Sequence, residues 1–339
     1  MIDQRILLPS APAIPGLVAR PFDPGRDYPA LAELMGIANQ ADGVEFILGA
    51  EALRVDFEHL AEFDPRRDVL LVEIDGALVA AAQTNVRTRD GMAVHHVDGW
   101  VRPDVRRQGI GRALLHWTER RSAEVARVDG RTGARVTTSW PDADQAGAIA
   151  LYEGEGYEII RYGFTMVRDL ADPIPDAPLP AGLEVRPVVA ADHRRIWDAD
   201  VEAFQDHWGR SEPLESDYER WFAIPENDPG TWQVAWDRGE VAGSVMPFVY
   251  PDENRTLGLS RGWLEHISVR RPWRRRGLAS ALIVRALRDF RERGLAEAAL
   301  GVDAENPTGA VALYEALGFH RTRTGIAYRK PLVVDDAAG

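Results

Sequence analysis

The sequence predicts an α/β fold built from two copies of one unit, each a mixed β-sheet flanked by helices. Three short motifs recur in the same order along the 339 residues. Gly16–Pro21 returns at 182–187, Arg106–Gly111 returns at 274–279, and Ala150–Glu153 returns at 312–315. Each motif and its repeat are 162 to 168 residues apart. Repeats in constant order and at nearly constant spacing indicate a duplicated structural unit.

Each copy opens with a short strand and a hairpin. The strand is predicted at the repeated Gly-Leu-x-x-Arg-Pro motif, and helical segments follow it. Asp75-Gly76 stands between the apolar stretches 69–74 and 78–83. This is a strong hairpin signal, because these two residue types tolerate the positive φ angles of a tight turn. The second copy has the same pattern around 232–236 and 241–245.

The rest of each copy alternates strands and helices. A strand ends at Val101, or at Val269 in the second copy, and a loop rich in arginine and glycine leads into an amphipathic helix. In the second copy the apolar residues of this helix recur every four positions and share one face: Leu278, Leu282, Ala286 and Phe290. A strand over 298–302, a helix that Gly318 stops, and a last strand follow. Such alternation, combined with a hairpin, predicts a mixed sheet.

The two copies are separated by a proline-rich stretch. Residues 173–181 contain four prolines, a composition typical of a stiff, extended linker. We therefore expect an N-terminal domain over 1–172, this linker over 173–181, and a C-terminal domain over 182–339.

Composition narrows the classes of function. With 40 basic and 53 acidic residues the net charge is −13, which argues against a nucleic-acid or membrane-surface partner. The absence of cysteine excludes disulfides, thiolate metal sites and cysteine nucleophiles. No signal-peptide pattern is present, and no apolar run approaches the roughly 18 residues of a membrane span. We expect a cytoplasmic protein, as a monomer or a dimer.

A dense basic segment stands out against this acidic background. Five arginines fall within 270–276, directly before a predicted helix. The N-terminus of a helix has unpaired N–H groups and the positive end of the helix dipole, and both favour an anion. Gly277 lets the backbone approach a bulky ligand, Ala279 avoids a side-chain clash, and arginines supply forked donors for phosphate oxygens. We expect a pyrophosphate group here; the alternative is a solvated basic turn.

Two further residues lie where a strand gives way to the next helix. Asn306 occupies a position at which side-chain amides cap helices or bind ligands. Tyr314 lies two turns further along, where a phenol facing a cleft can donate a proton to a developing anion. The alternative for Tyr314 is a core tyrosine with a satisfied hydroxyl. We do not expect a metal at His95-His96-x-Asp98, because adjacent strand residues face opposite ways.

The order and spacing of these motifs resemble the GNAT acetyltransferase superfamily. The Arg-x-x-Gly-x-Gly/Ala loop after a strand, followed by the tyrosine near the next helix, occurs in both copies, so nearly the whole chain resembles a tandem GNAT protein. The second half is similar to tandem members such as mycothiol synthase. The resemblance implies mostly antiparallel mixed sheets, acetyl-CoA as the donor, no metal, and the primary amine of a small molecule as the acceptor.

The resemblance also implies roles in the second copy. The loop 274–279 would hold the pyrophosphate of CoA, the main chain of the preceding strand would hold the pantetheine arm, and Tyr314 would protonate the leaving thiolate. The residues expected to bind the cofactor are Ile267, Val269, Arg274, Arg275, Arg276, Gly277, Leu278, Ala279 and Asn306.

Glu265 is the first candidate for the base that accepts the amine proton. It precedes Val269 by four residues, so regular strand geometry places it on the face of Ile267 and Val269 and places His266 on the opposite face. Many relatives have this glutamate two residues earlier, where this chain has Trp263. His266 and Asp303 are the other candidates, and a solvent-facing charge at a strand end is the alternative for Glu265.

The first copy keeps the loop but differs at catalytic positions. Asp144 replaces Asn306 and Val97 replaces Glu265, whereas Tyr152 matches Tyr314. We expect a degenerate N-terminal domain that binds CoA without catalysing transfer, through Val101, Arg106, Arg107, Gln108, Gly109 and Gly111.

The sequence therefore predicts an acetyl-CoA-dependent N-acetyltransferase that acts on a small-molecule amine, with its chemistry in the C-terminal domain. Two alternatives stay open: a non-catalytic acyl-CoA sensor or scaffold, and an enzyme of the mycothiol synthase type.

Overall fold

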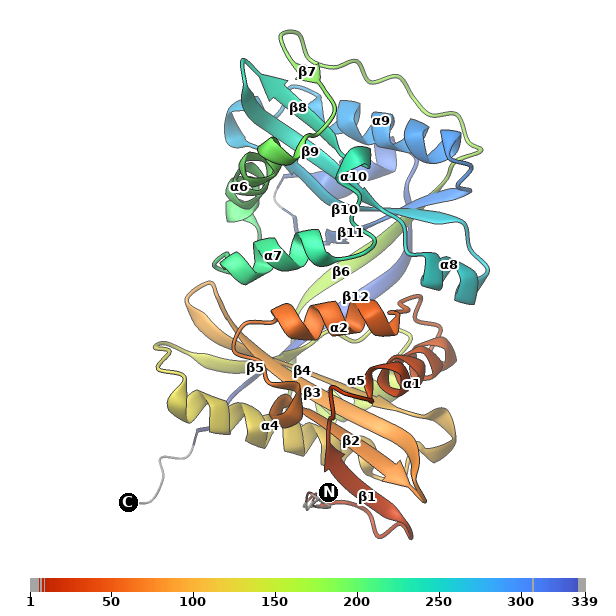
Figure 1. Ribbon diagram of the computed structural model, residues 1–339, viewed down its shortest axis with the longest axis vertical. Coiled ribbons are helices and arrows are strands. Elements are labelled where there is room, and N and C mark those ends of the chain that lie inside the picture. The colour runs from red at the N-terminus through yellow and green to blue at the C-terminus, as the bar shows by residue number, and fades with distance from the viewer. Residues whose placement is uncertain (1–5, 7, 9, 307, 335–339) are drawn as a thin grey trace. The chain divides into compact units, whose positions relative to one another are not determined.

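The computed structural model describes residues 6, 8, 10–306 and 308–334. The chain forms two compact units (Figure 1). Unit 1 combines Met1–Ile160 with Ile326–Gly339, and unit 2 is Arg161–Gly325. Within the described residues, no helix combines the length and the apolar character that crossing a membrane requires.

Unit 1 is a mixed sheet in the order β1-β2-β3-β4-β5-β12. Among the pairings described for this sheet, that of β4 with β5 is parallel and the others are antiparallel. Helices α1 and α2 pack on one face of this sheet, and α4 and α5 pack on the other (Figure 1). The elements are β1 (Leu17–Pro21), α1 (Tyr28–Ala41), α2 (Ala50–His59), α3 (Pro65–Asp68), β2 (Val69–Ile74), β3 (Ala77–Arg89), β4 (Met92–Val101), α4 (Ile110–Val128), β5 (Arg135–Ser139), α5 (Ala146–Gly154) and the end of β12 (His320–Pro331).

Unit 2 repeats this plan in the order β6-β11-β10-β9-β8-β7. Of the strand pairs described here, β10 and β11 run parallel and the others run antiparallel. Helices α6 and α7 cover one face, and α9 and α10 cover the other. The elements are β6 (Glu158–Asp169), β7 (Glu184–Val185), α6 (His193–Ala203), α7 (Glu215–Ala223), β8 (Gln233–Asp237), β9 (Glu240–Phe248), α8 (Pro251–Leu257), β10 (Arg261–Val269), α9 (Leu278–Glu292), β11 (Glu297–Asp303) and α10 (Ala310–Ala316). The predicted fold class is confirmed.

The last strand of each sequence repeat completes the sheet of the other unit. Strand β6 follows the N-terminal repeat, yet its residues 163–169 pair antiparallel with β11 of unit 2. Strand β12 ends the C-terminal repeat, yet its residues 328–331 pair with β5 of unit 1. The units therefore differ from the expected domains 1–172 and 182–339. The repeat shows which segments are alike, and nothing within a strand shows which sheet receives it.

Residues 173–181 have no regular secondary structure, but they belong to unit 2 and are not a free spacer. Ile174, Ala177 and Leu179 pack against the core beneath α9. Arg168 of β6, only 2% exposed, holds the start of this segment. Its guanidinium donates to the main-chain oxygens of Asp172 and Pro173 and to that of Leu317 at the end of α10. Among the described residues it has no carboxylate partner, so main-chain carbonyls alone accept from its two terminal nitrogens, and its Nε is buried without a partner.

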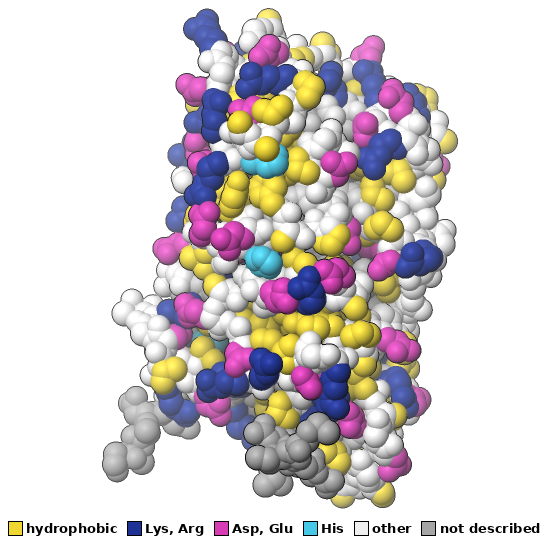
Figure 2. All heavy atoms as spheres, in the orientation of Figure 1, with side chains coloured by type: hydrophobic (Ala, Val, Ile, Leu, Met, Phe, Trp, Pro, Cys, Tyr) yellow, Lys and Arg dark blue, Asp and Glu magenta, His cyan; other side chains and the backbone are white. Residues whose placement is uncertain are grey.

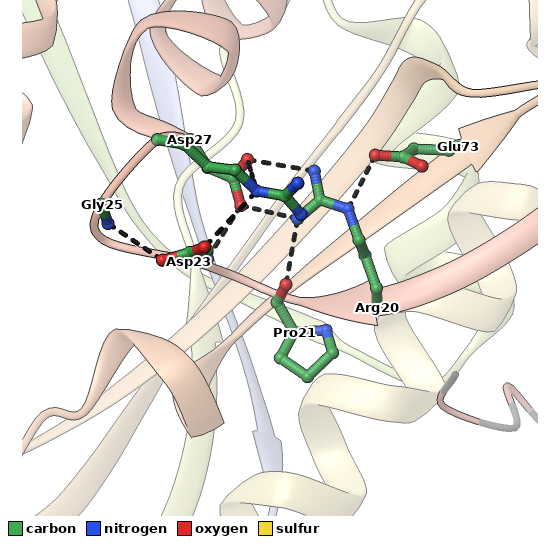
Figure 3. Close-up of polar contacts among 7 residues, drawn as sticks. Arg20, Pro21, Asp23, Gly25, Asp27 and Glu73 are labelled. Carbon is green, nitrogen blue, oxygen red and sulfur yellow. Dashed lines mark hydrogen bonds and ion pairs between the residues drawn. The ribbon is translucent and has the colours of Figure 1, made fainter. Parts of the chain in front are cut away.

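The repeated Arg-Pro motif joins the first strand of a unit to its first helix. Arg20 on β1 donates to both carboxylate oxygens of Asp27, at 2.6 and 3.0 Å, and to Glu73 on β2 at 2.7 Å (Figure 3). Asp27 immediately precedes α1. In unit 2, Arg186 pairs with Asp192, which immediately precedes α6. The motif therefore has a structural role in both copies.

Exposed ion pairs are common on the surface. Figure 2 shows basic and acidic side chains interspersed on the face in view. Examples are Arg54 with Glu58 and Arg194 with Glu215. Because exposed pairs contribute only about 0–1 kcal/mol each, the buried cores on the two faces of each sheet carry most of the stability.

Replacing Arg168 by leucine is expected to lower the free energy of unfolding by about 2–4 kcal/mol, because three main-chain oxygens lose a buried donor. Arg288 is the matched control, since it holds the same segment through Asp176 at the surface, with the two side chains 43% and 95% exposed. Arg288→Leu is expected to cost about 0–1 kcal/mol. Denaturant titration measures both, and equal losses would contradict the role of Arg168.

Cutting the chain between the two repeats is expected to leave the fragments associated, because each fragment contributes a strand to the other's sheet. A protease site inserted between Ala181 and Gly182, which are both exposed, allows this cut. After cleavage, gel filtration in native buffer should show one species of the intact size that separates only in denaturant. Elution at half the size would contradict the strand exchange.

Candidate active site

A cleft opens in unit 2 where β10 and β11 diverge. The two strands pair only over Arg261–Trp263 and 297–299, and beyond this point β10 keeps only β9 as a neighbour. The main-chain groups of 265–269 that would face β11 therefore have no strand partner. The cavity beside them has a volume of about 400 Å³. Predicted residues that line it are Ile267, Val269, Arg274, Arg275, Gly277, Leu278, Ala279, Asn306 and Tyr314.

The loop between β10 and α9 forms one end of this cleft. Arg275 has φ +61° and Gly277 has φ +82°. A non-glycine residue at positive φ costs of order 1–3 kcal/mol, a strain found mostly at functional sites. Gly277 precedes α9 and offers no side-chain cap, so the first N–H groups of the helix are available to a ligand.

The arginines of this loop have two different roles. Arg274 holds the loop, since it donates to the main-chain oxygens of Val269 and Ala203 at 2.9 and 3.0 Å and pairs with Asp206 at 2.6 Å. Hydrogen bonds from Arg271 and Arg274 keep the pKa of Asp206 well below its usual range. Arg275 and Arg276 make no hydrogen bond or ion pair with any described residue, and so they remain for an anionic ligand.

Tyr314 presents a buried hydroxyl to the cleft. The residue is 6% exposed, and burial raises the pKa of its hydroxyl to about 12. This hydroxyl makes no hydrogen bond with a described residue, which disagrees with the alternative of a satisfied core tyrosine. Tyr314 therefore keeps its proton at neutral pH and can donate it to a bound group.

Asn306 shapes the start of α10. Its Oδ1 accepts from the main-chain N and the Oγ1 of Thr308, at 2.8 and 2.6 Å. The side-chain NH₂ of Asn306 makes no hydrogen bond with a described residue. A contact from this NH₂ to a ligand in the cleft stays a prediction.

Glu265 lies at a bulge of β10. The pairing with β9 shifts by one residue between Leu264 and His266, so Glu265 is an extra residue on this strand. Ile267 packs toward the core beneath α9, whereas Glu265 accepts a hydrogen bond from Tyr250, which packs on the α6–α7 face. The prediction that Glu265 shares the face of Ile267 is therefore wrong. His266 lies on the face opposite to Ile267, as predicted, because its ring contacts Asp200 of α6 and Trp221 of α7. The bulge interrupts the regular alternation and brings Glu265 to this same face.

Two acid–base groups follow one another at this bulge. Glu265 is exposed, and desolvation by the surrounding protein raises the pKa of its carboxyl, opposed by the charge of His266 and the hydrogen bond from Tyr250. The Nδ1 of His266 lies 3.0 Å from Oδ2 of Asp200, a 4% exposed residue of α6. Burial alone would lower the pKa of His266, but the Asp200 carboxylate outweighs it and the pKa is raised.

The sequence did not reveal the role of Asp200, because no local pattern indicates that it contacts His266, which lies 66 positions further along the chain. The third candidate base, Asp303, is already in an ion pair with Arg161. Both of its oxygens accept hydrogen bonds of 2.8–2.9 Å from Arg161 of β6.

Unit 1 has the same backbone arrangement. Strands β4 and β5 pair only up to His96, and a cavity of about 200 Å³ lies beyond. Gly109, at φ +92°, precedes α4 without a side-chain cap. Arg106 donates to the main-chain oxygens of Val101 and Ala38 and pairs with Asp42. Arg274 makes the same set of contacts in unit 2, with two main-chain oxygens and one aspartate. Arg107, at φ +64°, and Gln108 have no hydrogen bond or ion pair within the described residues. Of the predicted residues, Val101, Arg106, Arg107 and Gly111 line the cavity.

The side chains in this second cleft differ. The hydroxyl of Tyr152 accepts a hydrogen bond of 2.7 Å from Ser139, where unit 2 has Gly301. Val97 is buried, and β4 pairs with β3 without a shift in register, so unit 1 has no counterpart of the extra residue Glu265. Asp144 is exposed, and its neighbour Gln145 lines the cavity instead.

Comparison with protein families gives two matches. Residues 193–319 match the acetyltransferase (GNAT) family, and residues 65–159 match an acetyltransferase (GNAT) domain. Each match falls in one of the two sequence repeats.

Similar proteins cover nearly the whole chain. A mycothiol acetyltransferase of Geodermatophilus obscurus is 30% identical over 311 residues, 89% of this chain and 93% of that protein. One of Kineococcus radiotolerans is 32% identical over 331 residues, 94% of this chain and 98% of that protein.

Solved structures agree with this relationship. The crystal structure of an N-acetyltransferase from Sphaerobacter thermophilus has a TM-score of 0.71 at 28% identity and covers 95% of this chain and 97% of its own. A tandem GNAT protein from the clavulanic acid pathway shares the fold, with a TM-score of 0.65 at 20% identity over 94% of this chain and all of its own. With two GNAT domains in one chain and full-length relatives of the same kind, this protein belongs to the GNAT acetyltransferases as a tandem, acetyl-CoA-dependent member.

Proposed function

We propose that unit 2 transfers an acetyl group from acetyl-CoA to the primary amine of a small molecule. The observation that carries this proposal is the cleft between the diverging strands, which has a phosphate-binding type of loop at one end and the free hydroxyl of Tyr314 in its wall. The exposed carboxylate of Glu265 lies at the bulge of the same strand.

The residues present suit CoA. Arg275, Arg276 and the uncapped N-terminus of α9 would bind the pyrophosphate. The unpaired main chain of 265–269 would bind the amides of the pantetheine arm much as a neighbouring strand would, through Ile267 and Val269. The NH₂ of Asn306 would add one side-chain donor.

Glu265 and Tyr314 would handle the protons. As the amine nitrogen bonds to the acetyl carbon and the carbon–sulfur bond breaks, Glu265 accepts a proton from the nitrogen and Tyr314 donates one to sulfur. A free thiol has a pKa near 8.5. Apolar surroundings like those of Tyr314 raise the pKa of the thiol. The pKa values of the thiol and of the Tyr314 hydroxyl then differ less, which favours proton transfer from Tyr314 to sulfur.

The relatives support a narrower choice of acceptor. The curated proteins that match most of the chain are named mycothiol acetyltransferases. We therefore propose the acceptor amine of that reaction as the first compound to test, alongside other small primary amines.

Replacing Tyr314 by phenylalanine is expected to lower kcat about 10²–10³-fold and to change the KM for acetyl-CoA little, because the hydroxyl acts on the leaving group. Thiol release reports the reaction without background, since the chain has no cysteine. Tyr162, 41% exposed on β6, is the matched control, and Tyr162→Phe should keep full activity. A Tyr314→Phe enzyme with an unchanged kcat would refute the proposed acid.

Replacing Glu265 by glutamine should lower kcat/KM at neutral pH about 10²–10⁴-fold. In the unsubstituted protein, activity should fall as pH drops through the pKa of Glu265, since a base must be unprotonated. The raised pKa places this fall above the ordinary glutamate value of 4.5. Glu265→Gln should remove this fall, the acidic limb of the pH profile. Glu315→Gln, the control at an exposed helix position, should leave this limb unchanged. A limb that persists in Glu265→Gln and disappears in His266→Gln would transfer the role to the Asp200–His266 pair.

A further inference from the structure

Unit 1 contains an acid–base pair on β4, at the position that corresponds to His266 on β10 of unit 2. Asp98 precedes Val101 by three residues, as His266 precedes Val269. Asp98 lines the cavity of unit 1. Its Oδ1 lies 3.2 Å from Nε2 of His96, and its Oδ2 accepts a hydrogen bond of 3.2 Å from Gln83. The carboxylate is therefore held in place beside the divergence of β4 and β5.

The imidazole of His96 completes this pair. His96 is the last residue of β4 that pairs with β5, and its Nδ1 lies 3.4 Å from Oγ1 of Thr138. Burial alone would lower the pKa of His96, but Asp98 outweighs burial and raises it. Each unit thus carries one carboxylate–imidazole pair at the same strand position. In unit 2 the imidazole is on the strand and the carboxylate on a helix, whereas in unit 1 both groups are on β4.

Tyr152 lies in the wall of the same cavity. Its oxygen accepts the hydrogen bond from Ser139 and therefore still has its own proton to donate. Burial raises the pKa of this hydroxyl, so the proton stays on at neutral pH. One cavity is thus lined by a cation next to the uncapped start of α4, Arg107, by a proton acceptor, Asp98, and by a proton donor, Tyr152.

We propose that unit 1 is a second acyl-transfer centre, which uses an acyl-CoA and a small primary amine. The Asp98 carboxylate attracts the cationic amine, which loses one proton to solvent and so frees its lone pair. As the nitrogen bonds to the acyl carbon, the Asp98–His96 pair takes a second proton from it. The carbon–sulfur bond breaks, and Tyr152 gives its proton to sulfur. Solvent then returns a proton from the pair to Tyr152, so amine and thioester become amide and thiol. This inference goes beyond the function proposed for unit 2 and replaces the expectation of a degenerate first copy.

Affinity labelling tests the placement without knowledge of the acceptor. Bromoacetyl-CoA puts an alkylating carbon where the acyl carbon lies, and a nearby imidazole or carboxylate displaces bromide. With the full-length protein, mass spectrometry of peptides should find the adduct on His96 or Asp98, and excess acetyl-CoA should prevent it. Labelling confined to residues of unit 2 would overturn the proposal.

Turnover tests the chemistry. In the Tyr314→Phe, Glu265→Gln background the full chain should retain saturable, amine-dependent thiol release with a panel of aliphatic, aromatic and amino-sugar amines. Adding Asp98→Asn or Tyr152→Phe should lower this residual rate at least tenfold, and Tyr162→Phe should not. A residual rate that neither substitution changes, or no residual rate at all, would overturn the proposal.

These outcomes are separable from those for unit 2. If Tyr314→Phe alone leaves the rate of the otherwise unsubstituted protein intact while Tyr152→Phe abolishes it, the function proposed for unit 2 fails and this inference holds. Thermal unfolding of Asp98→Asn, an isosteric change that keeps the partner of Gln83, shows whether a loss of rate reflects unfolding.

Discussion

The arrangement of both clefts depends on one constraint, a parallel pair of strands that starts together and then separates. A main-chain polar group inside a protein needs a partner, and leaving one unpaired costs about 1–3 kcal/mol. Past Trp263 in unit 2 and His96 in unit 1, the main chain of the central strand faces a cavity. A ligand with alternating donors and acceptors satisfies these groups. Under the proposed function, affinity for the arm of CoA would reside in backbone geometry, which survives side-chain replacement.

The loops after these strands divide their side chains between structure and binding. All three guanidinium nitrogens of Arg274 and of Arg106 donate to the end of the preceding strand and to the C-terminal region of α6 or α1. The next residue in each unit, Arg275 or Arg107, has a strained backbone and a side chain without a hydrogen bond or ion pair to any described residue. The contacts of Arg274 or Arg106 hold this strained backbone in place. The cation at the start of the helix is therefore already positioned, and a ligand that binds it does not have to order the loop, which would cost entropy.

Sequence patterns were sufficient for the elements and the loops, because these depend on local chemistry. The hairpin at Asp75-Gly76, the strand ends at Val101 and Val269, and the helix through Tyr314 all appear where predicted. Long-range features were not predictable. The bulge at Glu265 depends on register with β9, the pairing of Asp200 with His266 depends on how α6 packs, and the partners of β6 and β12 depend on the path of the whole chain.

The exchange of strands affects how the protein is made. Many chains fold domain by domain as they leave the ribosome, the first domain closing before the second is synthesised. Here the strand that covers β5 contains Tyr328 and comes last in the second repeat. Unit 1 must therefore wait, with the edge of β5 uncovered, until the second repeat has been translated as far as β12. During that interval the open edge can recruit a neighbouring chain, so the rate of elongation and the presence of chaperones bear directly on the yield of correctly folded protein.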